Sequence, residues 1–254
     1  LCDGDPKEGE WPAEGKIELK SYCMRYRPNL PLVLKQISCT IPAGSTVGIC
    51  GRTGSGKSSL FASLFRLVEP AEGSILIDDV DTSKLGLSYL RSKLAIIPQD
   101  PVLFVGNIRM NLDPFDNYTD GEIWDALKLC NMSQAINTRP DKLLTLVSEG
   151  GSNFSQGQRQ LLCIARALLR KPKILLLDEA TASIDFKTDT AIQSMIKENF
   201  KNCTTLTIAH RLNTISDSDI IMVLDNGRLV EFDTPMNLLK IDGGVYKDMV
   251  EKDV

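Results

Sequence analysis

The sequence predicts an α/β protein with a parallel sheet at its centre. Short apolar strands alternate with segments of helical periodicity, and the run Ile174 to Leu177 is apolar at every position, as in a strand buried on both faces. The early strands, up to about Ile41, alternate in hydrophobicity and look antiparallel, whereas residues 100–170 are mainly helical in pattern. We therefore expect an antiparallel β subdomain and a helical subdomain beside the central sheet.

The predicted elements follow from hydrophobic period and from turn residues. The predicted strands are Lys16 to Tyr26, Leu32 to Ile41, Ser45 to Cys50, Gly73 to Ile77, Leu94 to Ile97, Ile174 to Leu177, Thr204 to Ile208, Ile220 to Leu224 and Arg228 to Phe232. The last two flank Asn226-Gly227, which predicts a hairpin. The predicted helices are Ser58 to Leu67, Glu122 to Cys130, a helix capped by Ser155 that runs to about Leu169, and Lys187 to Phe200. Thr234 and Pro235 are expected to begin a further helix.

Composition and charge narrow the class of protein. The chain has 254 residues, of which 43% are hydrophobic and 24% charged, with a net charge of -4. This acidic balance argues against a nucleic-acid partner, because nucleic-acid binders usually carry a basic surface. Seven scattered cysteines without a C-x-x-C pair, together with one histidine, predict reduced thiols and argue against a zinc site.

The sequence predicts a short linker followed by one domain. Residues 1–15 are acidic and rich in Gly and Pro, so they are expected to form the linker, and residues 16–254 the domain, with the helical subdomain at roughly 100–170. No apolar run approaches the roughly 20 residues that span a bilayer. If the domain serves a membrane protein, we expect the membrane-spanning part to lie outside this chain.

The segment Gly51 to Ser58 reads GRTGSGKS and has the spacing of a phosphate-binding loop. Glycines let the backbone curl so that N–H groups point at an anion, and the helix that follows adds its positive N-terminus. Lys57 is expected to reach the phosphates, and the Ser58 hydroxyl to ligate Mg²⁺. The alternative is a chance Gly/Ser-rich loop, but here a strand precedes the segment and a helix follows it, as a phosphate loop requires.

An acidic pair ends the apolar strand that reads ILLLDE. Asp178 is placed to hold the shell of a Mg²⁺ ion, and Glu179 to polarise a water molecule that attacks a phosphate. Taken alone, an Asp-Glu pair is more often a solvated turn at the end of a strand. The phosphate loop in the same chain favours the interpretation as a metal and catalytic site.

Further motifs extend the match to a known family. Ser155 to Gln158 reads SQGQ and is followed by RQLLCIARALL, and the acidic strand continues as LLLDEATASID. Together with the phosphate loop, Gln99 and Ala209-His210-Arg211, these motifs occur in the order found in the nucleotide-binding domain of ABC transporters. The chain resembles that domain from about Lys16 to Met249, which implies a P-loop NTPase core with a helical signature subdomain.

The resemblance implies ATP and Mg²⁺ as ligands and a role for each matched residue. Tyr26 would stack on the adenine, Glu179, His210 and Gln99 would be catalytic, and Asp185 would communicate across a dimer interface. The residues implied in nucleotide binding are Tyr26, Gly51, Arg52, Thr53, Gly54, Ser55, Gly56, Lys57, Ser58, Ser59, Ser155, Gln156, Gly157 and Gln158, and those implied in metal binding are Ser58, Gln99 and Asp178. Read without the family, Tyr26 would be a core aromatic, Gln99 a loop amide and His210 a structural histidine.

Several stretches resemble the second nucleotide-binding domain of subfamily C, the multidrug-resistance group. They are Trp11-Pro12, Gly15 to Ile17, Met24 to Leu34 and Asn111 to Trp124. The signature departs from the family pattern LSGGQ, because residues 154–158 read FSQGQ and Gln156 replaces the first glycine. A glutamine there crowds the approach to a nucleotide held by a partner domain. We therefore expect the second of two shared sites to be the weaker one.

The resemblance implies the ATP-hydrolysing motor of a membrane exporter, at the cytoplasmic face of a membrane as part of an integral membrane protein. The domain would pair with a second nucleotide-binding domain of the same transporter, and it would contact the transmembrane domains through the region from Gln99 to Asn111. The alternative is a nucleotide-sensing module that regulates a channel or receptor of the same subfamily. Soluble family members of DNA repair or translation are disfavoured, because the sequence shows neither a long coiled-coil insertion nor a basic surface.

Overall fold

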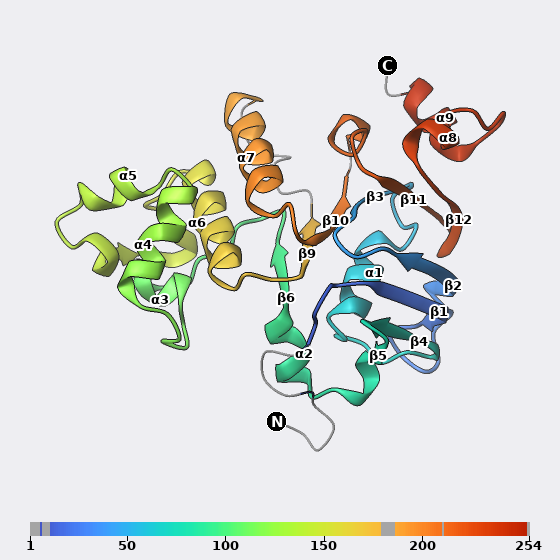
Figure 1. The fold of residues 1–254 in the computed structure, drawn as a ribbon, viewed down its shortest axis with the longest axis horizontal. Coiled ribbons are helices and arrows are strands. Elements are labelled where there is room, and N and C mark those ends of the chain that lie inside the picture. Colours follow the sequence, from blue (N-terminus) through green and yellow to red (C-terminus); the bar gives the residue numbers. More distant parts are fainter. Residues whose placement is uncertain (1–5, 7–10, 179–185, 210, 253–254) are drawn as a thin grey trace. The chain divides into compact units, whose positions relative to one another are not determined.

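The chain divides into two units, which Figure 1 shows coloured along the sequence. A computed structural model describes residue 6 and residues 11–178, 186–209 and 211–252. The core unit comprises residues 1–94, 173–178 and 202–254, and the helical unit comprises residues 95–172 and 179–201. Strand β6 (Leu94–Ile97) crosses from the core unit into the helical unit.

Two sheets form the framework of the core unit. The antiparallel sheet has the order β2-β1-β4-β5, with β1 (Ile17–Met24), β2 (Leu34–Ile41), β4 (Glu72–Ile77) and β5 (Val80–Asp81). The second sheet contains the order β12-β11-β3-β10-β9, with β3 (Thr46–Cys50), β9 (Ile174–Asp178), β10 (Thr204–Ile208), β11 (Ile220–Asp225) and β12 (Arg228–Asp233). Strands β11, β3, β10 and β9 run parallel, and β12 returns antiparallel to β11 through a hairpin. The carboxyl ends of the parallel strands therefore share one edge.

Helices of the core unit complete its hydrophobic core. They are α1 (Lys57–Leu64), α2 (Leu87–Lys93), α8 (Pro235–Leu238) and α9 (Val245–Lys252), with single 3₁₀ turns at Thr82–Lys84 and Leu212–Thr214. Leu60 and Leu64 of α1 are buried in one cluster with Ile17 of the antiparallel sheet and Ile49 of the parallel sheet. Each such side chain contributes about 1.5–3 kcal/mol on burial, so the cluster joins α1 firmly to both sheets.

Residues 11–15 of the predicted linker pack against the core unit. Trp11 is buried, donates its indole N–H to the carbonyl of Ile77 (2.8 Å) and stacks on Tyr89. Asp78 accepts hydrogen bonds from the backbone N–H groups of Glu14, Gly15 and Lys16. Burial alone would raise the pKa of Asp78, but these bonds lower it overall. Residues 11–15 are thus held against the edge of β4, which the composition of the segment does not indicate.

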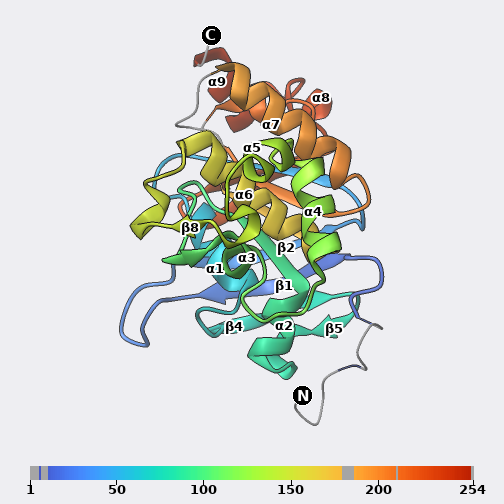
Figure 2. The ribbon, with the colours of Figure 1, turned by 90° about the vertical axis from the view of Figure 1, so that its left-hand side faces the viewer.

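The helical unit is built around α6 (Gln156–Leu169), beside which α3 and α4 pack (Figure 2). Its other elements are α3 (Ile108–Leu112), α4 (Asp120–Leu129), α5 (Ser133–Asn137), α7 (Phe186–Asn199), the two-stranded ribbon of β7 (Gly106–Asn107) and β8 (Leu146–Val147), and 3₁₀ turns at Lys142–Leu144 and Glu149–Gly151. Reciprocal capping boxes begin two of the helices, Thr119 with Glu122 at α4 and Ser155 with Gln158 at α6. In the described part of the chain, every helix is too short or too polar to cross a bilayer.

The structure confirms the predicted fold class and most of the predicted elements. The strand predictions lie within two residues of the observed bounds, and the Asn226-Gly227 hairpin and the Ser155 cap are present. The helix predicted over Ser58 to Leu67 is wrong at its C-terminal end, because α1 stops at Leu64 and Arg66 adopts a positive φ of 48°. Helices α2, α3, α5 and α9 were not anticipated.

Candidate phosphate-binding site

The loop between β3 and α1 has the shape of a phosphate cradle. It leaves the parallel sheet at Cys50 and enters α1 at Lys57, with Gly56 as the residue that precedes the helix. Gly56 has a φ of +108° and Gly51 a φ of +147°, so both lie in the region that favours glycine. The loop therefore curls back onto the N-terminus of α1, where free N–H groups and the helix dipole favour an anion.

Lys57 begins α1, and its side chain turns back into the loop. Only 8% of the residue is exposed, and its Nζ donates to the carbonyls of Gly51 (2.7 Å) and Arg52 (3.2 Å). Burial lowers the pKa of Lys57, and the nearby Asp178 works in the opposite direction. The ammonium group thus lies inside the loop and is held there by backbone carbonyls, ready to pair with an anion.

Two serines of the loop supply further polar groups. Ser55 is buried, and within the described residues its Oγ has no hydrogen-bond partner, although an unpaired buried hydroxyl is costly. Ser58, at the second position of α1, is exposed and has an accessible hydroxyl. An unsatisfied hydroxyl, a buried ammonium and an accessible serine form a donor set that fits a phosphate group with a divalent cation.

Asp178 lies close to the loop because of strand register. It ends β9 and pairs with Ile208 of β10, and Ile208 in turn pairs with Ile49 of β3, two residues before the loop. Parallel strands bring their carboxyl ends to one edge, so Asp178 and the loop share that edge of the core unit. Sequence reasoning placed the two together, and the register agrees.

Tyr26 follows β1 and contacts the first turn of α1. Its hydroxyl lies 2.9 Å from Oγ of Ser59, and either atom can be the donor. Half of Tyr26 is exposed (50%), so it is not the core aromatic that the strand pattern allowed. The ring is left with a free surface beside the phosphate loop.

The signature residues belong to the helical unit. Ser155 Oγ accepts from the Gln158 backbone N–H (3.2 Å), and Gln158 Oε1 accepts from the Ser155 N–H (3.1 Å). Phe154, directly before them, is buried under the Arg139 guanidinium, 4.4 Å from the ring centre. These contacts fix the N-terminus of α6, where Gln156 and Gly157 occupy the first two helical positions.

The segment from Gln99 to Asn111 is held by a polar frame inside the helical unit. Buried Asn111 accepts from the backbone N–H of Phe104 and donates to its carbonyl, both at 2.8 Å. Arg166 of α6 donates to the carbonyls of Asn111 (2.8 Å) and Val102 (3.4 Å). Sequence reasoning missed these contacts, since a half-buried arginine that binds carbonyls has no local signature.

The same segment presents apolar side chains to solvent. The exposed ones are Val102, Phe104, Val105 and Met110. Gln99 at the start of the segment is exposed as well. We call residues 102–110 the apolar loop, because Asn111 and Arg166 hold its backbone while these four apolar side chains are exposed. Leu103 and Ile108 in the same range are buried. Glu179, Asp185 and His210, which the sequence also singled out, lie outside the described residues.

The chain is similar to known proteins over nearly its whole length. Residues 34–182 match the family model described as ABC transporter. The chain is 53% identical over 252 residues to "ABC transporter C family member 13" of Oryza sativa, which is 99% of this chain and 17% of that protein. It is 55% identical over 237 residues to "ATP-binding cassette sub-family C member 2" of Homo sapiens, 93% of this chain and 15% of that protein. The chain thus spans about a sixth of the length of these relatives.

A solved structure is similar in fold. The "Structure of a bacterial Atm1-family ABC exporter with ATP bound" aligns with a TM-score of 0.86 and 37% identity, and the alignment covers 94% of this chain and 42% of that chain.

Proposed function

This chain belongs to the ABC transporter family, and from that membership we propose that it is the ATP-binding and ATP-hydrolysing motor domain of a membrane exporter of subfamily C. The observation that carries the proposal is the loop from Gly51 to Ser58, which holds the Lys57 ammonium near Asp178. The same loop holds a buried Ser55 hydroxyl that has no hydrogen-bond partner among the described residues. Intact Asp178 and Glu179 favour a motor over a purely nucleotide-sensing module, since both acidic positions of the site are present.

The loop binds the phosphates of ATP. Lys57 exchanges part of its bonding to Gly51 and Arg52 for the phosphate oxygens, and the N–H groups at the start of α1 complete the cradle. Ser58 and Asp178 are placed to hold Mg²⁺, which supplies positive charge to the phosphates. Glu179 takes the role of general base that orients and polarises the attacking water, with Gln99 and His210 assisting.

The site is completed by a second nucleotide-binding domain. Its signature segment would face the nucleotide held by this chain, while Ser155 to Gln158 of this chain face the partner's nucleotide. In this chain Gln156 occupies the first helical position of α6, where glycine would leave the backbone open. The two shared sites are therefore unequal, and the one that uses this signature is the weaker.

The apolar loop is the surface through which the chain engages the transmembrane domains. Four of its apolar side chains are exposed, yet Asn111 and Arg166 hold its backbone in place, so little ordering is needed when a partner docks. On this proposal the chain lies at the cytoplasmic face of a membrane as part of an integral membrane protein.

Removing an apolar side chain from this loop should uncouple the domain from the membrane part. In Phe104→Ser, where 60% of the phenylalanine is exposed, the affinity for the transmembrane domains is expected to fall roughly 5- to 20-fold, because burying that exposed part contributes about 0.9–1.8 kcal/mol. Binding is measured by pull-down of the chain on the detergent-solubilised membrane part. Phe115→Ser, at a 75% exposed phenylalanine outside the loop, is the control and should bind as the unmodified chain does. Equal losses for both would place the docking surface elsewhere.

Tyr26 provides the surface on which the adenine stacks, so its loss should lower the affinity for ATP and for ADP alike. Tyr26→Ala is expected to weaken ATP and ADP binding to the same extent, by the ~1–3 kcal/mol that base–aromatic stacking contributes. Tyr26→Phe keeps the ring and removes only the bond to Ser59, so it should retain most of the affinity. Isothermal titration with both nucleotides measures this. A loss confined to ATP would exclude Tyr26 as that surface.

A measurement of ATP turnover distinguishes the motor function from the regulatory one. The assembled transporter should hydrolyse ATP through many cycles, and the rate should respond to transported substrate. A transporter that binds ATP at this site but hydrolyses less than one equivalent would favour the nucleotide-sensing alternative.

A further inference from the structure

The hairpin turn between β11 and β12 touches the phosphate loop directly. Gly227, in that turn, donates its N–H to the carbonyl of Ser55 (3.0 Å). Its own carbonyl accepts from the Lys35 N–H at the start of β2 (2.8 Å). One residue thus connects the loop to the antiparallel sheet, although more than 170 residues separate Gly227 from Ser55 in the sequence.

The hairpin leaves no room for a side chain at two glycines, Gly227 where the turn meets the start of β2 and Gly51 where the loop meets β11. A Cβ on Gly227, whose φ is +79°, would lie 1.9 Å from the Val33 carbonyl oxygen. A Cβ on Gly51 would lie 2.1 Å from the carbonyl oxygen of Leu224, the last but one residue of β11. The loop thus contacts the hairpin through the backbone at two places, by close packing at Gly51 and by the bond from Gly227 at Ser55.

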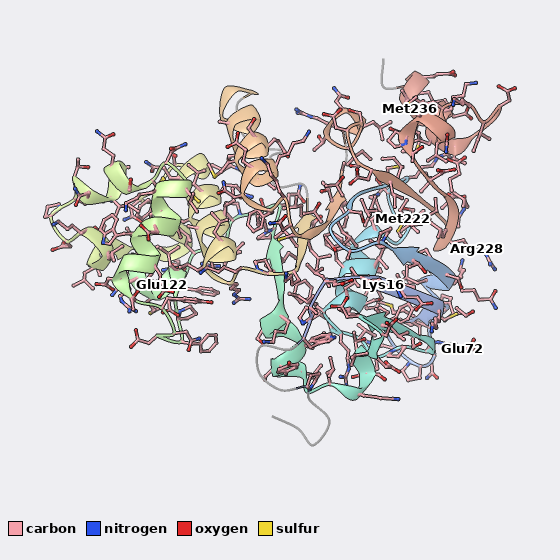
Figure 3. All side chains as sticks on the ribbon, viewed as in Figure 1. Lys16, Glu72, Glu122, Met222, Arg228 and Met236 are labelled. Atoms are coloured by element: carbon pink, nitrogen blue, oxygen red, sulfur yellow. The ribbon has the colours of Figure 1, made fainter. Side chains whose placement is uncertain are left out.

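The second strand of the hairpin, β12, is held by α9. Glu231 of β12 accepts from the N–H groups of Val245 (2.6 Å) and Tyr246 (2.9 Å) and so caps α9. Tyr246 is buried in one cluster with Cys50, the residue directly before the loop. Met222 of β11 is buried, whereas Arg228 at the start of β12 points into solvent (Figure 3). The turn meets the loop through the backbone bond from Gly227 to Ser55.

We propose that Gly227 is a positioning residue for the phosphate loop: its N–H holds the Ser55 carbonyl outward, so that the loop amides that follow face the phosphates. The inference rests on the proposed binding of nucleotide phosphates by Gly51 to Ser59. Pre-arranged N–H groups bind an anion without an ordering cost, so a loop released from the hairpin binds more weakly. Gly227 itself touches no nucleotide in this arrangement.

The test compares three glycines of the core unit with similar backbone angles. Gly227→Ala places a Cβ against the Val33 carbonyl oxygen and so displaces the turn whose N–H bonds to Ser55 of the loop. Gly73→Ala, at φ +73°, creates a comparable clash in the antiparallel sheet, with its Cβ 2.3 Å from the Lys20 carbonyl oxygen. Gly243→Ala, at φ +71°, places its Cβ in open space. Urea unfolding reports stability, isothermal titration reports Mg-ADP affinity, and hydrogen exchange reports the amides of residues 52–58.

Gly227→Ala and Gly73→Ala should both lose stability, and Gly243→Ala much less. Only Gly227→Ala should weaken Mg-ADP binding, roughly 3- to 10-fold or about the worth of one hydrogen bond, and speed exchange in residues 52–58. Equal losses of affinity in Gly73→Ala, or unchanged affinity and exchange in folded Gly227→Ala, would overturn the inference. Failure of the unmodified chain to bind Mg-ADP would instead contradict the proposed function, and the exchange data would still test the link to the loop.

A second measurement needs no substitution. In the unmodified chain, Mg-ADP should slow exchange at the Gly227 and Lys35 amides, because ordering the loop tightens the hairpin that holds it. Unchanged exchange at both amides in the saturated protein would show that the hairpin and the loop are not linked.

Discussion

Replacing Lys57 with alanine is expected to weaken Mg-ATP binding by roughly 10- to 150-fold. Lys57 holds its ammonium inside the phosphate loop, where burial lowers its pKa and the available partners are the carbonyls of Gly51 and Arg52. A phosphate anion is a stronger partner than a carbonyl, since hydrogen bonds to charged groups contribute ~1.5–3 kcal/mol. Isothermal titration of the chain with Mg-ATP measures the loss directly.

Lys84→Ala is the matched control for this prediction. It removes one positive charge from an exposed 3₁₀ turn of the core unit, so any general effect of net charge on ATP affinity appears there. Unchanged affinity in Lys57→Ala, with the fold intact by circular dichroism, would exclude this loop as the phosphate site.

Replacing Glu179 with glutamine should separate binding from catalysis. The substitution keeps the size of the side chain and removes the carboxylate that acts on water, so turnover of the assembled transporter should fall by ~10²–10⁴. Affinity for ATP should stay within a few-fold, because the ground-state contacts come from the loop and from Asp178, and an interaction made only in the transition state lowers rate without lowering binding. The closed, ATP-bound dimer should accumulate and be detectable by cross-linking.

Two further variants sharpen the result. Glu198→Gln removes an exposed carboxylate of α7 and should hydrolyse ATP at the normal rate. Asp178→Asn should weaken the Mg²⁺ dependence of binding, which Glu179→Gln should not do. Normal hydrolysis by Glu179→Gln would remove Glu179 from the catalytic role and favour the regulatory alternative.

The fold was predictable where structure is specified locally. The ILLL run, the Asn-Gly turn and the Ser155 capping box each carry their own signal in a few neighbouring residues, and each is found as predicted. Helix α9 was missed because its cap is remote: Glu231, 14 residues upstream of Val245, accepts its first N–H groups. The reason why α1 ends at Leu64 is also remote in sequence, because the Arg66 side chain donates hydrogen bonds to the carbonyls of Thr82 and Leu85.

In the candidate site, too, features with a local sequence signal could be predicted and contacts between distant segments could not. The positions of the loop and of Asp178 could be predicted, because residue type and spacing set them locally, whereas their roles in binding phosphate and metal stay predictions. The Gly227 contact and the Asn111–Arg166 frame were not, because they consist of bonds to backbone carbonyls of distant segments, and such bonds place no demand on the residue type at the acceptor.

ATP turnover by this chain, measured as the other nucleotide-binding domain of the same transporter is titrated in, tests the shared-site account most directly. The chain alone at low concentration should be a monomer and hydrolyse ATP slowly, because its site lacks the signature of a partner. Turnover per chain should then rise with added partner domain and reach a plateau, and Glu179→Gln should abolish the rise. Fast hydrolysis by the dilute chain alone, unaffected by the partner, would contradict the account.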